Sequence, residues 1–193
     1  MWAVWIGLAA IIEAFNLDDL PDLLAITAER LPAVFPIHMV SSGLTLVFLP
    51  LTIALRRWPR WHRMSGRLTS LCVVIGAVTA LIVAVYSISP MLARVGFFAQ
   101  GLIWITLLSA GLVMARRRRT SGHRRLMLMM TAVTSGAVLF RLALAGFVFC
   151  LPWADYKPFY SAIAWLGWML PFAVAAWVTR SQVDRAARQF QDL

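Results

Sequence analysis

Five long apolar runs constrain this chain more than any other feature of its sequence. Each reaches the roughly 20 residues that an α-helix needs to cross the hydrocarbon core of a bilayer, and only the fourth contains a charge. The chain is 61% hydrophobic and 13% charged, too few charges for the surface of a soluble domain. We therefore predict an all-α, multi-pass transmembrane bundle, with spans in Phe35–Leu55, Leu68–Ile88, Phe97–Ala115, Leu126–Cys150 and Ser161–Thr179.

Short connections divide the chain into three parts. Consecutive helices joined by short loops pack as antiparallel neighbours, so residues 35–150 should form a four-helix core. Residues 1–34 hold a short apolar segment, Met1–Phe15, and an acidic outer segment, Asn16–Ala33, in which Pro21 should start a surface helix. Met1–Phe15 is either a short sixth membrane helix, which we favour, or a segment lying in the interface. Residues 151–193 hold the last span and a basic tail.

The net charge of +10 comes from arginines gathered on one side of the predicted bundle. Fourteen of the 17 arginines lie in Arg56–Arg67, in Arg116–Arg125 or after Thr179, and these segments share a side if the runs alternate. The positive-inside rule then places them, and the C-terminus, in the cytoplasm. The arginines are expected to contact anionic lipid head groups. We expect no nucleic-acid partner.

Two cysteines lie near opposite ends of their runs. Cys72 is near the cytoplasmic end of the second run, and Cys150 is at the outer end of the fourth. A disulfide needs Cα atoms within about 7 Å, so we predict two free thiols, both buried. Neither belongs to a CxxC motif.

Two histidines begin membrane helices on the predicted cytoplasmic side. His62 and His123 are two helices apart, so in an up-down bundle they can face each other diagonally at one depth. Such a pair suits the axial ligation of a b-haem iron by two neutral imidazoles. Neighbouring guanidinium groups could bind the haem propionates; they belong to Arg63, Arg67, Arg124 and Arg125. The alternative is that both His-Arg pairs lie among lipid phosphates.

Arg141 is the charge inside the fourth run. A charge at membrane depth is costly unless paired or hydrated, which makes it a candidate functional residue. We expect it to face the bundle in an outer polar pocket with His38, Tyr86 and Gln100, suited to an anion, a quinone head group or a haem propionate. The alternative is a structural polar knot between helices. No nucleophile–base pair, phosphate loop or paired acidic site is visible, and the sequence leaves open whether the chain is an enzyme.

Together these motifs resemble a family of bacterial membrane proteins called domain of unknown function 2306. Its members combine an outer histidine, an His-Arg-x-x-Gly-Arg loop, a tyrosine ending the next helix, and an His-Arg-Arg-x-Met entry to a helix with a buried arginine. The corresponding residues are His38, His62 to Arg67, Tyr86, His123 to Met127 and Arg141, within about Phe35–Cys150. The resemblance implies the fold and the residue set but no activity. The likeness to haem-binding four-helix bundles such as cytochrome b561 is an analogy of fold.

Three functions follow as hypotheses. The leading one is a subunit of a membrane redox system that binds b-haem through His62 and His123 and transfers electrons. The second is a haem-free structural or assembly subunit that packs against other membrane-protein subunits through its last helix. The third is a small transporter or sensor built on the pocket at Arg141.

Overall fold

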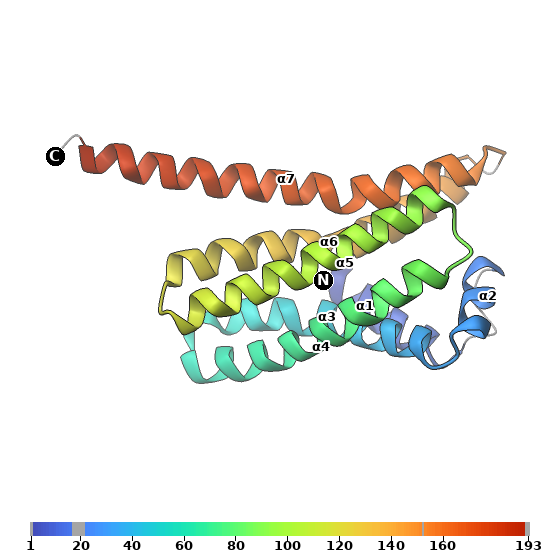
Figure 1. Ribbon diagram of the computed structural model, residues 1–193, viewed down its shortest axis with the longest axis horizontal. Helices are drawn as coiled ribbons and strands as arrows, with labels where there is room; N and C mark the ends of the chain where they lie inside the picture. The colour runs from blue at the N-terminus through green and yellow to red at the C-terminus, as the bar shows by residue number, and fades with distance from the viewer. Residues whose placement is uncertain (1, 17–21, 152, 192–193) are drawn as a thin grey trace.

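A computed structural model describes residues 2–16, 22–151 and 153–191, with only the backbone for residues 22–23 and 181–191. All the regular elements of these residues are helical (Figure 1). They are α1 (Trp2–Glu13), α2 (Asp22–Arg30), α3 (Val34–Ala54), the 3-10 turn η2 (Leu55–Arg57), α4 (Pro59–Tyr86), α5 (Met91–Arg116), α6 (Thr120–Cys150) and α7 (Tyr156–Gln191).

Five of these helices are long and apolar enough to cross a membrane, which confirms the predicted fold class. They are α3 with η2, α4, α5, α6 and α7 as far as Arg180. α1 has 12 residues, or about 18 Å at 1.5 Å per residue, and so falls short of the ~30 Å hydrocarbon core. α2 begins one residue after Pro21, which itself lies outside the described residues.

The basic segments that join the spans are mostly helical. α4 begins at Pro59 and α6 at Thr120, several residues before the apolar runs begin. Arginine is a good helix former, so the helices continue beyond the apolar residues. Between α5 and α6 the turn is closed by Arg118, whose φ of 57° is left-handed. We call the end of the bundle that holds these two turns the basic end; it is the left-hand end in Figure 1.

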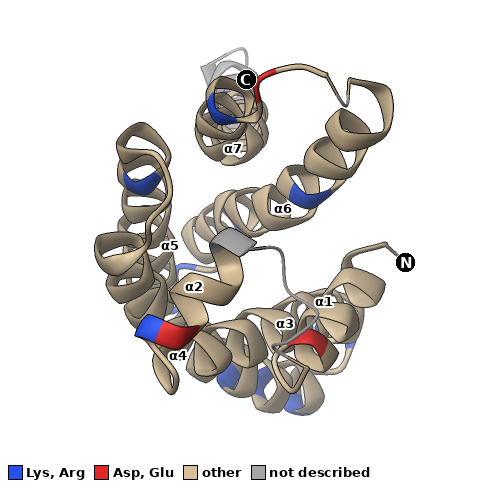
Figure 2. Cartoon of the chain, turned by 90° about the vertical axis from the view of Figure 1, so that its right-hand side faces the viewer, with Lys and Arg blue, Asp and Glu red and all other residues tan. Residues whose placement is uncertain are grey.

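The four central helices follow one another around the bundle (Figure 2). α3 packs on α4, α4 on α5 and α5 on α6, while α7 lies against α6 and α5 and α1 lies against α3. α3 and α6 are not packed along each other. The arrangement is therefore an up-down bundle that is open between its first and last helices.

Glycines allow the two peripheral helices, α1 and α7, to pack closely against the four central helices. α1 crosses α3 where Gly7 meets Gly43, so closely that a Cβ added to Gly43 would lie 2.6 Å from the Gly7 carbonyl oxygen. α7 meets α6 at Gly136, where an added Cβ would lie 2.6 Å from the Cβ of Trp168. Small residues allow such close approach of helices in membranes.

Large apolar side chains fill the centre of the bundle. Val73, Leu108, Met130 and Val133 are at most 2% exposed, and each comes from α4, α5 or α6. Trp104 donates a hydrogen bond from Nε1 to Thr134 Oγ1 at 2.8 Å. The exposed large side chains are themselves mostly apolar, as a lipid-facing surface requires.

The opposite end of the bundle carries α2 and the turn between α4 and α5; we call it the α2 end. Arg94, near the start of α5, donates hydrogen bonds to the carbonyl oxygens of Ala84 and Val85 at the end of α4. Both cysteines are free, as predicted. Cys72 is buried, but Cys150 is exposed on the last turn of α6, so the prediction that it is buried is wrong. Phe147 of the same turn is buried, and its ring stacks on Phe159 of α7 with ring centroids 4.3 Å apart.

Candidate functional site

Both histidines of the basic end bind the helix that precedes their own. His62, in the first turn of α4, lies with Nδ1 2.9 Å from the Thr52 carbonyl oxygen of α3. His123, in the first turn of α6, lies with Nδ1 2.9 Å from the Gly111 carbonyl oxygen of α5. A carbonyl oxygen only accepts hydrogen bonds, so the hydrogen-bond network assigns the proton of each neutral ring to Nδ1. Nε2 then keeps a lone pair for another partner.

Buried hydroxyl groups surround the attachment point of His62. Thr52 Oγ1 lies 2.6 Å from Ser65 Oγ and 2.9 Å from Thr69 Oγ1, and it donates to the Phe48 carbonyl oxygen at 2.8 Å. Thr52, Ser65 and Thr69 are all less than 9% exposed. The peptide that accepts the His62 bond is therefore fixed by a network joining α3 to α4.

Apolar packing surrounds the attachment point of His123 instead. The methyl group of Met127 lies over Gly111, in the space that a side chain on that residue would occupy. Met114 packs in the same way beside Gly122. The lack of a side chain on Gly111 lets Met127 reach the α5 backbone next to the His123 bond.

The two imidazoles belong to separate hairpins. α4 and α6 both begin at the basic end, and α5 packs against each of them. The arginines proposed to bind propionates, Arg63, Arg67, Arg124 and Arg125, all have exposed side chains. The donor set suits bis-imidazole ligation, because a histidine that ligates a metal commonly donates its other ring N–H to a backbone carbonyl.

His38 occupies the half of the bundle nearer the α2 end. Its Nδ1 lies 3.1 Å from the Gly76 carbonyl oxygen of α4 and 3.4 Å from the hydroxyl oxygens of Ser42 and Thr79. By the reasoning used for the other two histidines, Nδ1 carries the proton and Nε2 the lone pair. All three histidines thus join α3 to α4 or α5 to α6.

Arg141 lies in the same half, on α6. Its guanidinium lies within electrostatic range of the His38 ring on α3 and of the Glu13 carboxylate at the end of α1. Among the residues that the structure describes, none forms an ion pair with the guanidinium or accepts a hydrogen bond from it. Three helices therefore bring ionisable groups together around an arginine without a direct partner.

The other two predicted pocket residues point elsewhere. Gln100 donates from Nε2 to the Val133 carbonyl oxygen at 3.2 Å, which joins α5 to α6. Tyr86, the last residue of α4, is 59% exposed. Sequence reasoning missed Glu13, which lies in the short apolar segment Met1–Phe15. The available signal was its position, six residues after Gly7, at the end of a helix that packs on α3.

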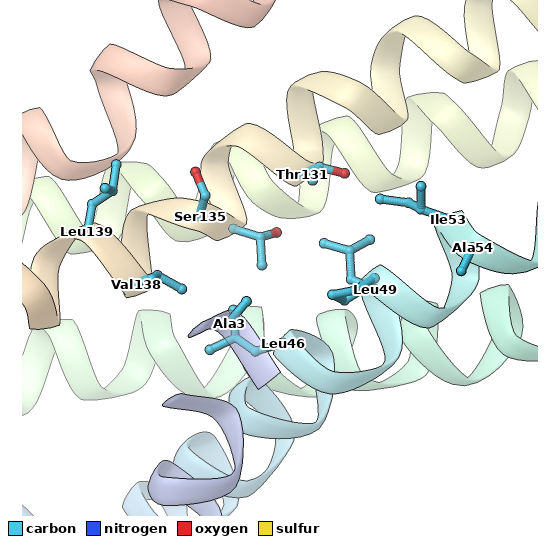
Figure 3. Close-up of a pocket in the computed structure, with 11 residues that line it drawn as sticks. Ala3, Leu46, Leu49, Ile53, Ala54, Thr131, Ser135, Val138 and Leu139 are labelled. Atoms are coloured by element: carbon cyan, nitrogen blue, oxygen red, sulfur yellow. The ribbon is translucent and has the colours of Figure 1, made fainter. Parts of the chain in front are cut away.

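A cavity of about 490 Å³ lies on the open side of the bundle, between α3 and α6 (Figure 3). Its walls include Leu46, Leu49 and Ile53 from α3 and Thr131, Ser135 and Val138 from α6, with Ala3 of α1 at one side. The Thr131 and Ser135 hydroxyls donate to carbonyl oxygens of their own helix. The walls are therefore apolar in effect, and we call this cavity the lateral groove.

Comparison with known proteins identifies the family of the chain and no activity. A family model described as "Predicted membrane protein (DUF2306)" matches residues 35–179. No curated protein and no solved structure matches the chain.

Proposed function

The chain belongs to the DUF2306 family of predicted membrane proteins, and we propose that it is a subunit of a membrane redox system that holds a b-haem between His62 and His123. One observation carries the proposal. Both imidazoles have Nδ1 bound to a backbone carbonyl oxygen at 2.9 Å, at the same end of the bundle, so both Nε2 atoms are free to ligate.

The chain's own residues would orient the ligands. The Thr52 and Gly111 carbonyl oxygens fix the ring orientation of His62 and His123, and the hydroxyl network of α3 and α4 fixes the first of these carbonyls. Arg63, Arg67, Arg124 and Arg125 supply guanidinium groups for the propionates. A b-haem with two imidazole ligands supplies one-electron transfer.

Asparagine variants test this role, because the side-chain amide of asparagine places an N–H near the position of Nδ1 but offers no ligand at Nε2. The wild-type protein, purified from haem-replete cells, should show a sharp Soret band and split α and β bands on reduction. That spectrum should be lost in His62→Asn and His123→Asn, and also in His62→Ala and His123→Ala. His38→Asn is the control and should keep it. A colourless wild-type protein, or asparagine variants with an unchanged spectrum, would reject the haem.

A second function is favoured by one observation. His38 makes the same kind of bond as the other two histidines, at the other end of its hairpin, where no second imidazole is near. All three bonds would then serve only to tie helices together in a haem-free structural or assembly subunit. In that case the asparagine variants should equal the wild type in thermal stability, the alanine variants should lose about 1 kcal/mol each, and the protein should be colourless.

We also propose that the basic end faces the cytoplasm of a bacterial inner membrane, with the C-terminus on that side. The segregation of 14 arginines supports this orientation. Single cysteines placed at Arg60 and Arg119, in a variant without Cys72 and Cys150, should be protected from an impermeant thiol reagent in intact cells. A cysteine at Ser87 should be labelled. Labelling at either arginine position from outside would reverse the orientation.

A further inference from the structure

Arg141 and the lateral groove belong to the same side of the bundle. The groove is walled by α6, by α3 and by Ala3 of α1, and Arg141 lies on α6 within electrostatic range of Glu13 at the end of α1. On α6, Arg141 follows Val138 by three residues and Thr134 by seven, so it continues the helix face that lines the groove. The walls of the groove run from Thr131 to Leu139 on α6 and from Leu46 to Ala54 on α3, about 12 Å of helix rise on each side. Arg141 follows Leu139 by two residues, so a polar site stands at one end of the apolar groove.

The polar site offers both a donor and acceptors. Arg141 provides N–H groups that no described residue accepts. His38 provides the lone pair of Nε2, since Nδ1 donates to Gly76. Glu13, whose charge interacts with that of Arg141, offers carboxylate oxygens. A head group that fits such a site carries oxygens that both accept and donate, and it need not be charged because Glu13 already offsets Arg141.

We propose that this site binds an isoprenoid quinone, with the ring between Arg141 and His38 and the chain in the lateral groove. The quinone carbonyl accepts a hydrogen bond from Arg141, and the hydroxyl of the quinol donates to His38 Nε2. A phospholipid fits less well. Its anionic head belongs at the membrane surface, whereas Arg141 is nine residues, about 13 Å, inside the end of α6, and Glu13 would repel a phosphate.

The open side of the bundle gives the ligand a route. Because α3 and α6 are not packed along each other, a long apolar chain can enter between them from the lipid, beside α1, which contacts both helices. Ala3, at the start of α1, borders the groove and contributes only a methyl group to it (Figure 3). The proposal is independent of the haem, which would bind at the opposite end.

Titration of the purified full-length protein with menaquinone-4 or ubiquinone-4, read by native mass spectrometry, tests the site. The wild type should bind one quinone per chain. Arg141→Leu should weaken binding about tenfold, the loss expected for one charge-assisted hydrogen bond. Val138→Trp, which fills the groove, should weaken it at least as much. Val78→Trp is the matched control: Val78 is 46% exposed on α4 and does not line the groove, so binding should not change.

Competition identifies the head group. Phosphatidylglycerol and palmitate should fail to displace the quinone from the wild type. Displacement by either, or equal quinone affinity in the wild type, Arg141→Leu and Val138→Trp, would overturn the proposal. The visible spectrum of Arg141→Leu separates this result from the haem hypothesis: it should match the wild-type spectrum whether or not the quinone is lost. A change in that spectrum would overturn the independence of the two sites.

Discussion

The two hairpins of the bundle, α3 with α4 and α5 with α6, are closed by the same kinds of bond set in different surroundings. In each, a histidine at the start of the second helix binds a carbonyl oxygen of the first. In each, an amide or imidazole of the first helix, Gln100 or His38, binds a carbonyl oxygen of the second. The first hairpin adds a network of three buried hydroxyls, whereas the second adds methionine packing and one buried hydrogen bond, from Trp104 to Thr134.

One peripheral helix packs against each hairpin, and each of these contacts is made at a glycine. α1 lies on the first hairpin through Gly43, and α7 lies on the second through Gly136. Two similar helix pairs can therefore be held together by different contacts. The pair with the buried hydroxyl network, α3 with α4, is the one that packs against α1. Loss of a hydroxyl should therefore lower the free energy of unfolding more in the first hairpin, and a change in side-chain shape should lower it more in the second.

Gly43→Leu should have the largest effect. The new side chain meets the Gly7 carbonyl oxygen and the Ile11 side chain, both too close to accept it, so α1 must leave α3. Overpacking of this kind costs about 3 kcal/mol, which should lower the midpoint of thermal unfolding in detergent. Gly146→Leu is the control, because an added Cβ there meets nothing within 4 Å. Equal midpoints for the two variants would mean that α1 is not seated at Gly43.

Thr52→Val should weaken the first hairpin by about 2 kcal/mol. The change preserves the shape of the side chain but leaves buried Ser65 without its hydroxyl partner, and an unsatisfied buried group costs about 1–3 kcal/mol. Reversible unfolding in mixed detergent micelles measures the loss. On α5, Thr106→Val removes an exposed hydroxyl that binds its own helix, and the stability should change by less than about 0.5 kcal/mol. A similar loss in both variants would contradict a special role for the hydroxyl network.

Trp104→Phe should lower the free energy of unfolding by about 1 kcal/mol more than Trp168→Phe does. Both remove part of a buried ring, but only Trp104 has a hydrogen-bond acceptor, Thr134 Oγ1. Among the described residues, none accepts a bond from Trp168 Nε1. The difference between the two free energies of unfolding therefore isolates one hydrogen bond. If Trp168→Phe were the more damaging change, ring packing on Gly136 would outweigh the bond.

Gly66→Ala and Gly111→Ala should show the smallest effects. A Cβ on Gly66 makes ordinary contact with Thr52 Cγ2 at 3.7 Å, so the substitution should stabilise helix α4 by about 0.5 kcal/mol. On Gly111 the same Cβ displaces the methyl group of Met127, and that gain should be lost. Thermal unfolding of the two variants side by side measures the difference. A larger gain at Gly111 would show that Met127 is loosely packed.

The spans were predictable from sequence because a bilayer demands long apolar runs. Their ends were not, since the helical turns at Pro59 and Thr120 lie among arginines and carry no apolar signal. The bonds of His62 and His123 to carbonyl oxygens also escaped prediction, because every residue has a carbonyl and sequence does not say which one a ring will meet. Glu13 beside Arg141 depends on the glycine contact between α1 and α3, which requires two distant residues to be paired in space.

The bond from Arg94 to the end of α4 bears on how the chain enters the membrane. An arginine beside a span favours the side on which the other arginines remain, yet Arg94 lies at the opposite end from the basic turns. Its guanidinium binds the carbonyl oxygens of Ala84 and Val85, at the negative end of the α4 dipole. Once α4 and α5 pair, this positive charge is matched within the turn itself. The two helices can therefore insert together as one hairpin, with the charge of Arg94 bound inside the folded turn.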